Sequence, residues 1–294
     1  MSISTMHSLK HTQAIFYGDY RFADVFASMK RAPESLIDRV QEIPGAEKIE
    51  SRVVAPVKIN IRDFPDPVTG LLISIPDSGE PLLNNLYLRQ GRLPEPFRDN
   101  EVVIGEAFAE AHGFIPGDVL DLVINGKHKT FSIAGIALSP EHIYQMPPGA
   151  FFPDFERYGV MWMRRTPLST AYDMEGSFND ISLTLSLSAA REDIIDRLDN
   201  ILKPYGGLGS YSRKDQLSHR YLSEEFRSLE NMSTMFPIIF LSVAAFLLHV
   251  VISRLISMQR EEIAVLKAFG YSNMDIGIHY LKLVFLIVLA GAWP

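Results

Sequence analysis

Few residues of this 294-residue chain have the types and spacing that catalysis or metal binding requires. His7 and His11 stand four positions apart, so on a helix they would share one face and could chelate a metal ion, but no third ligand lies near them in the sequence. Glu224-Glu225 and Glu261-Glu262 are adjacent pairs. On a helix, adjacent side chains point about 100° apart, so neither pair suits acid–base catalysis.

The motifs of common enzyme classes are missing from the sequence. Gly126-Lys127 lacks the upstream glycine and the following hydroxyl of G-x-x-x-x-G-K-[ST], and H-E-x-x-H, G-x-S-x-G and S-x-x-K do not occur. The chain has no cysteine, which excludes disulfides and zinc–thiolate sites, and its formal charge of -7 argues against nucleic-acid binding. We therefore expect no enzymatic activity, no cofactor, no metal site and no nucleic-acid partner.

The most distinctive feature of the sequence is a long apolar segment near its C-terminal end. Residues 231–253 contain no Asp, Glu, Lys or Arg, and about 20 apolar helical residues span the hydrocarbon layer of a membrane. A second apolar run, Leu283–Trp293, lies next to Pro294 at the end of the sequence. We expect two membrane helices, the second incomplete. His249 is an intramembrane polar residue of the first helix, and both a gating role and a neutral hydrogen bond to another helix are open to it.

The region before the membrane segment has the pattern of an α+β domain, which we place at residues 1–212. Period-2 alternation predicts strands, Asn-Gly between alternating runs predicts a hairpin, and apolar spacings of three and four predict helices. The predicted elements are a helix Pro33–Ile43, strands around Val57–Ile61 and Leu71–Ile75, a helix Glu106–His112 ended by Gly113, a hairpin turning at Asn125-Gly126, and a helix Arg191–Leu202.

Two further regions complete the expected organisation. Residues 213–234 form a helical stalk, which either runs on into the bilayer or packs on the domain. Residues 235–294 form a transmembrane region, with a helix at 235–256, a loop at 257–275 and an incomplete helix at 276–294. The loop contains Arg260 and Lys267, which mark it as cytoplasmic by the positive-inside tendency, although Arg220 and Arg227 on the other side weaken that asymmetry.

The loop itself has the pattern of a short amphipathic helix. Ile263, Leu266 and Phe269 would form an apolar stripe, Gly270 would end the helix, and Ser272 or Asn273 would cap the next one. Such a helix suits a groove on a partner protein, with the neighbouring charges fixing its register.

Gln259–Ser272 resembles the loop after the second membrane helix in ABC transporter permeases of the FtsX/MacB/LolC type, in which E-I-x-x-L-K-A-x-G is characteristic. The upstream region is similar to the MacB-like periplasmic core domain through Gly91–Pro94, Asn100–Ile104, Asn125-Gly126 and Gly135-Ile136, which occur in the family's order. The resemblance implies that the loop docks on a cytoplasmic ABC ATPase. The implied coupling residues are Arg260, Glu261, Glu262, Ile263, Leu266, Lys267, Phe269 and Gly270.

The same resemblance implies a permease subunit in the bacterial inner membrane, in contact with membrane lipid and with its N-terminal domain in the periplasm. It further implies a second permease chain, in a homodimer or heterodimer, and a cargo or periplasmic adaptor protein. Family members have one membrane helix before the periplasmic domain and three after it, whereas here the first is missing and the third is cut short. The leading expectation is a permease subunit, truncated at both ends, that serves export or extraction of an unknown substrate. The alternatives are a membrane-anchored periplasmic binding or adaptor module and a nonfunctional fragment of a permease gene.

Overall fold

A computed structural model describes residues 3–62, 64–150 and 152–292 of the chain. The chain divides into two compact units, Met1–Leu229 and Glu230–Pro294. One helix, α6 (Leu217–Met258), begins in the first unit and ends in the second. All the strands of the described residues belong to the first unit, which confirms the expected α+β class.

One sheet of the first unit has four antiparallel strands, in the spatial order β11-β1-β10-β2. Helix α2 (Leu36–Gln41) connects β1 to β2, and α5 (Arg191–Leu202) connects β10 to β11. The apolar residues of both helices share one buried cluster with those of β1 and β10. The connectivity is that of a ferredoxin-like βαββαβ unit. The strands are β1 (Val25–Pro33), β2 (Ala46–Arg52), β10 (Ser177–Leu185) and β11 (Ser210–Ser212).

The second sheet lies in the chain between β2 and β10 and has the order β5-β8-β6-β9-β4-β3-β7. Strand β8 pairs with β7 through its first half and with β6 and β5 through its second half. Six strands therefore close into a barrel, with β5 outside it on the edge of β8. The strands are β3 (Val54–Asn60), β4 (Val68–Ile75), β5 (Tyr87–Gly91), β6 (Glu101–Gly105), β7 (Val119–Ile124), β8 (Lys127–Leu138) and β9 (Tyr158–Arg164).

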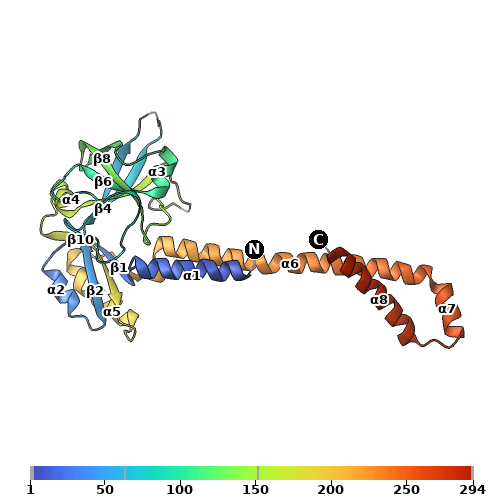
Figure 1. The fold of residues 1–294 in the computed structure, drawn as a ribbon. Helices are drawn as coiled ribbons and strands as arrows, with labels where there is room; N and C mark the ends of the chain where they lie inside the picture. Colours follow the sequence, from blue (N-terminus) through green and yellow to red (C-terminus); the bar gives the residue numbers. More distant parts are fainter. Residues whose placement is uncertain (1–2, 63, 151, 293–294) are drawn as a thin grey trace. The chain divides into compact units, whose positions relative to one another are not determined.

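The barrel encloses the largest apolar core of the unit. Leu72, Ile104, Leu122 and Met161 are fully buried there, together with Phe108 of the short helix α3 (Glu106–His112). Figure 1 shows β4, β6 and β8 with α3 as one lobe, and β1, β2 and β10 with α2 and α5 as the other. The chain passes from β2 to β3 across Val53 and returns through α4 (Arg165–Ala171) to β10.

Most of the locally encoded elements are where the sequence predicts them. Asn125 and Gly126 have φ values of 45° and 77° between β7 and β8, as a type I′ turn requires. The helices Glu106–His112 and Arg191–Leu202 are confirmed, and Gly113 ends the first of them with φ of 71°. The prediction of a helix from Pro33 is wrong at its start, because Pro33 pairs with Ser177 at the end of β1 and α2 spans only Leu36–Gln41.

The first described residues of the chain form a helix. Helix α1 spans Ile3–Asp19 and includes His7 and His11, and no cluster of three or more metal-ligating side chains occurs among the described residues. Near the end of α1, the Tyr17 hydroxyl lies 3.0 Å from Nδ1 of His219 in the first turn of α6. The start of α6 therefore contacts the end of α1 within the first unit.

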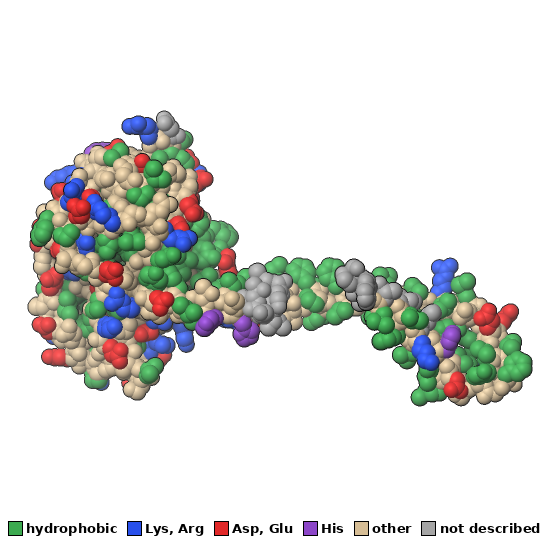
Figure 2. Space-filling view, in the orientation of Figure 1, with side chains coloured by type: hydrophobic (Ala, Val, Ile, Leu, Met, Phe, Trp, Pro, Cys, Tyr) green, Lys and Arg blue, Asp and Glu red, His purple; other side chains and the backbone are tan. Residues whose placement is uncertain are grey.

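The second unit consists of the rest of α6, helix α7 (Arg260–Ala268) and helix α8 (Asn273–Ala292). Among the described residues, α6 is the one helix that is long and apolar enough to span a membrane, and none of its apolar window is buried. Its exposed side chains include Phe236, Ile239, Phe240 and Leu241, and hydrophobic side chains cover the middle of α6 in Figure 2. A helix with this surface needs an apolar solvent. The second expected span falls on α8, except for Trp293 and Pro294, which lie outside the described residues.

Candidate functional site

Helix α7 begins and ends through local interactions that its own sequence supplies. Glu261 and Glu262 lie in its first turn and Lys267 in its last turn, so the charges at both ends favour the helix dipole. At the C-terminus, Gly270 has φ of 92°, its N–H donates to the Lys267 carbonyl at 3.0 Å, and the Tyr271 N–H donates to the Leu266 carbonyl at 3.2 Å. These two bonds form a Schellman motif, which confirms that Gly270 ends the helix.

The start of α8 is fixed by a capping box that follows directly. The Asp275 N–H donates to Ser272 Oγ at 3.3 Å, and the Ser272 N–H donates to Asp275 Oδ2 at 3.1 Å. Two hydrogen bonds lower the pKa of Asp275. The larger effect comes from the Ser272 hydroxyl and the smaller one from the Ser272 N–H. Of the two predicted caps, Ser272 is therefore the one that the structure uses. The connection between α7 and α8 has a defined geometry at both of its ends.

The sequence predicts one apolar stripe on α7, and the structure places its members in two environments. Ile263 is half-buried and lines a hollow of about 400 Å³ together with Lys267, Ile256 of α6 and Tyr280 of α8. The Tyr280 hydroxyl donates to Gln259 Oε1 at 2.6 Å and so ties α8 to the residue before α7. In contrast, the side chains of Leu266 and Phe269 are 41% and 79% exposed.

The charged members of the predicted site all lie on the surface of α7. Arg260, Glu261, Glu262 and Lys267 are exposed, and none of them forms an ion pair with another described residue. The outer face of α7 therefore offers two apolar side chains and unpaired charges of both signs. Such a surface can bind a groove that has an apolar floor and a charged rim. His249 is exposed on α6 and is not part of this surface.

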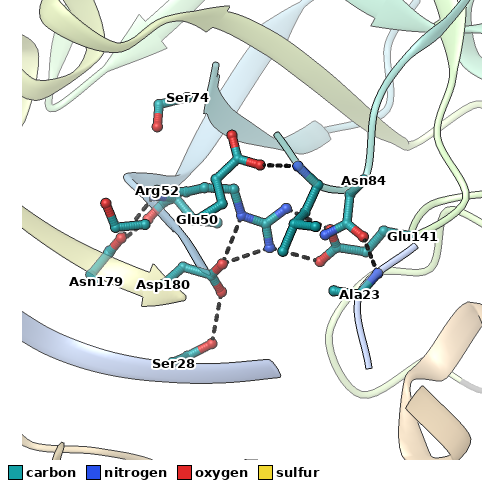
Figure 3. A network of polar contacts seen from close by, with 12 residues as sticks. Ala23, Ser28, Glu50, Arg52, Ser74, Asn84, Glu141, Asn179 and Asp180 are labelled. Atoms are coloured by element: carbon teal, nitrogen blue, oxygen red, sulfur yellow. Dashed lines mark hydrogen bonds and ion pairs between the residues drawn. The ribbon is translucent and has the colours of Figure 1, made fainter. Parts of the chain in front are cut away.

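A second polar cluster, which the sequence does not predict, lies buried in the first unit (Figure 3). The Arg52 guanidinium of β2 donates to Asp180 Oδ1 of β10 at 2.8 and 2.6 Å, and to Glu141 Oε2 and Oε1 at 2.5 and 3.0 Å. Glu141 follows β8 of the barrel, so these bonds join the two sheets. We call this cluster the Arg52 joint.

Neighbouring groups complete the hydrogen bonding of the Arg52 joint. Ser28 donates to Asp180 at 3.1 Å, and Asn84 donates to Glu141 at 2.9 Å. Burial alone would lower the pKa of Arg52, but Asp180 and Glu141 raise it well above its ordinary value. Arg52, Asp180 and Glu141 thus form a buried ion-pair network that joins the two sheets, which is a structural role.

Residues 234–293 match the family of the FtsX-like permease C-terminal region. This segment contains the end of α6, α7 and α8, so this part of the chain is similar to the C-terminal region of FtsX-like permeases. The resemblance predicted from Gln259–Ser272 is confirmed there. No curated protein matches the chain in sequence.

Two solved structures are similar to the chain at low identity. One is the extracellular domain of the noncanonic ABC-type transporter YknZ from Gram-positive bacteria, with 11% identity, a TM-score of 0.41, and coverage of 65% of this chain and 98% of that one. The other is the periplasmic region of MacB from Actinobacillus actinomycetemcomitans, with 9% identity, a TM-score of 0.40, and coverage of 74% and 98%.

Proposed function

We propose that this chain is the permease subunit of an ABC transporter and that α7 transmits movement between a separate cytoplasmic ATPase and the first unit. The observation that carries the proposal is α7 itself. It is a short helix fixed at both ends, it presents Leu266, Phe269 and unpaired charges, and it lies within the segment that matches FtsX-like permeases. A rigid exposed helix transmits force better than a flexible connection, because a displacement of its surface displaces both attached helices.

The rest of the proposal follows from that role. The permease lies in the bacterial inner membrane with α6, and α8 beside it, in contact with lipid. The first unit faces the periplasm and engages the cargo or an adaptor protein, and a second permease chain forms the other half of the transporter. Movement reaches the first unit through α6, whose first turns are held by Tyr17 and Tyr144. The chain relays ATP-driven movement and performs no catalysis.

A photo-crosslinking amino acid in place of Leu266 tests the contact directly in intact membranes. We expect it to capture a protein that carries a Walker A motif, and we expect ADP and ATP analogues to change the yield. The Glu262→Ala/Lys267→Ala double variant should lose association with that ATPase. The matched control is Glu192→Ala/Lys203→Ala, which removes the same two charge types from exposed positions of the first unit.

Three results would argue against coupling through α7. They are capture of lipid alone at Leu266, capture of a protein without a nucleotide-binding motif, and unchanged ATPase association of the double variant. The last result, in a chain that still reaches the membrane, would favour the membrane-anchored binding module.

A further inference from the structure

A hollow of about 660 Å³ in the first unit has an apolar floor and a cationic rim. Tyr17, Phe22 and Leu83 are buried and form part of its lining. The lining also includes the end of α1, the turn into β1, and the starts of β2, α5 and α6. Its charged side chains are Arg21, Lys48, Arg191, Arg213 and Lys214, against only two carboxylates, Asp24 and Glu47. This excess of positive charge contrasts with the formal charge of -7 of the whole chain.

Two of the cations are held by the fold. The Arg213 guanidinium donates to the carbonyls of Phe22 and Ala23 and pairs with Asp24 at 2.8 Å. Arg21 donates to the Pro81 carbonyl at 3.2 Å. Asp24 also accepts the Leu185 N–H at 3.0 Å. Of the two carboxylates of the hollow, Asp24 is therefore already bonded to Arg213 and to a backbone donor.

The other three cations have no partner among the described residues. Lys48, Arg191 and Lys214 form no side-chain hydrogen bond or ion pair there, and Nε of Arg191 is a buried donor without an acceptor. A buried donor that lacks an acceptor costs free energy, and more when it is charged. A bound acceptor would remove this cost.

Arg191 and Arg213 also repel each other. Burial is the largest influence on the pKa of Arg213 and lowers it, while the negative charge of Asp24 raises it. The positive charge of Arg191 lowers this pKa further. Burial and the charge of Arg213 lower the pKa of His219, which also lines the hollow. Each of these effects weakens when an anion lies between the cations.

We propose that this hollow binds a phosphate group, with the Arg191 guanidinium as its principal ligand and Lys48 and Lys214 as further cations. A guanidinium fork matches two phosphate oxygens at once, and the lysines approach from β2 and from the segment before α6. Donors on several segments suit a tetrahedral anion better than a planar carboxylate, which offers oxygens on one side only. The apolar floor suits a phosphate ester whose organic part is apolar, so an anionic phospholipid headgroup and a free phosphate share the required chemistry.

The test measures phosphate binding to the full chain in a neutral detergent, by isothermal titration with inorganic phosphate and with glycerol 3-phosphate at constant ionic strength. We expect Arg191→Gln to weaken phosphate binding at least tenfold and Lys48→Gln to weaken it several-fold. Arg197→Gln, which removes the same charge from an exposed position of the same helix, should leave binding unchanged. Lys48→Gln alters an exposed side chain, so it keeps the test valid if Arg191→Gln fails to fold.

A second arm distinguishes the two sources of phosphate. The chain is placed in nanodiscs of phosphatidylcholine alone or of phosphatidylcholine with one quarter phosphatidylglycerol. Loss of inorganic-phosphate binding only in the anionic discs assigns the site to a lipid headgroup, and equal binding in both assigns it to a soluble phosphate. Equal affinity for acetate and phosphate, or equal weakening by Arg191→Gln and Arg197→Gln, would overturn the proposal. Neither arm involves an ATPase, so its outcome is independent of coupling through α7.

Discussion

The hydroxyl of Tyr144 donates a 2.6 Å hydrogen bond to Glu225 Oε2, and the Tyr144 ring lies 4.5 Å from that of Tyr221. Tyr144 belongs to the segment after β8, and both of its partners belong to α6. The same segment carries Glu141, whose backbone carbonyl accepts a hydrogen bond from Nε2 of Gln216 at 2.6 Å. One short stretch of chain thus contacts Arg52 of the four-stranded sheet and the first turns of α6, so it links the sheet to the helix.

Removing the Tyr144 hydroxyl tests this link. Tyr144→Phe keeps the ring contact with Tyr221 but loses the hydrogen bond to Glu225, which should lower the free energy of unfolding by about 0.5–1.5 kcal/mol. Burial raises the pKa of Tyr144 above the ordinary tyrosine value of 10, and Glu225 raises it further. In an absorbance titration of the wild type, this hydroxyl should therefore still be protonated at about pH 10. Tyr221→Phe is the control, because no hydrogen bond of its hydroxyl occurs among the described residues. Equal destabilisation by both variants would show that the hydrogen bond from Tyr144 to Glu225 makes no specific contribution to stability.

The Arg52 joint should be the most sensitive polar cluster of the first unit. Arg52→Met leaves Glu141 and Asp180 buried without a cation, which should cost about 3–5 kcal/mol in the free energy of unfolding. The measurement is denaturant unfolding followed by tryptophan fluorescence. Combining Arg52→Met with Glu141→Leu and Asp180→Leu should recover most of that loss, because no uncompensated charge remains.

An exposed arginine gives the matched comparison for the Arg52 joint. The Arg157 side chain pairs with Asp66 and Asp154 but is 51% exposed, so Arg157→Ala should cost less than about 1 kcal/mol. Similar costs for Arg52→Met and Arg157→Ala would contradict the expectation that the Arg52 joint is the most sensitive polar cluster of the first unit.

Glu101 should give the first unit part of its acid sensitivity. Its buried carboxylate accepts two hydrogen bonds from Arg92, both at 2.8 Å, and these lower its pKa from 4.5 to about 2. Because the folded-state pKa is depressed, the stabilisation is complete above about pH 4.5 and disappears as the pH falls through about 2. The difference in unfolding free energy between wild type and Glu101→Gln should therefore shrink over that window. Glu110→Gln, which changes an exposed side chain, is the matched control.

Gly270 should be required for the geometry of α7. Its φ of 92° suits glycine and strains residues with a side chain. Gly270→Val should disturb the C-terminus of α7 and reduce association with the ATPase several-fold in a pull-down, while the first unit keeps its thermal transition. Gly277→Ala is the control, since an added methyl group there meets open space within α8. Full association of Gly270→Val would mean that the end of α7 does not contribute to docking.

The lack of cysteine makes the expected orientation easy to test. Single cysteines at Lys267 of α7 and at Leu187, an exposed side chain of the first unit, report on the two sides of the membrane. A membrane-impermeant maleimide added to spheroplasts should label Leu187→Cys, and it should label Lys267→Cys only after lysis. Labelling of both cysteines before lysis would contradict the proposed topology.

Sequence patterns predict those parts of the molecule that are encoded within a few residues. The Asn125-Gly126 turn, the Gly113 and Gly270 helix ends and the Ser272 cap each follow from local backbone preferences. The barrel closure does not, because it depends on β8 pairing with three different strands. The Arg52 joint also lacks a local signal, since its carboxylates lie 89 and 128 positions from Arg52 in the chain.

Pro33 shows how tertiary pairing overrides a local pattern. A proline before an apolar repeat of helical spacing is typical of a helix start, but Pro33 and Ala32 pair with β10 and extend β1. The split of the α7 stripe has a similar origin. Ile263 packs toward Ile256 and Tyr280, and the sequence of α7 alone does not show which side these neighbours occupy.

The interrupted ferredoxin-like sheet imposes an order on biosynthesis. Strands β1 and β2 leave the ribosome early, but the strand that lies between them, β10, begins only at Ser177, after all the barrel strands have been made. The barrel can therefore reach its native form before β10 is available to pair with β1 and β2. During that interval the edges of β1 and β2 that later pair with β10 and β11 are exposed, so chains that end before Ser177 should bind chaperones most strongly.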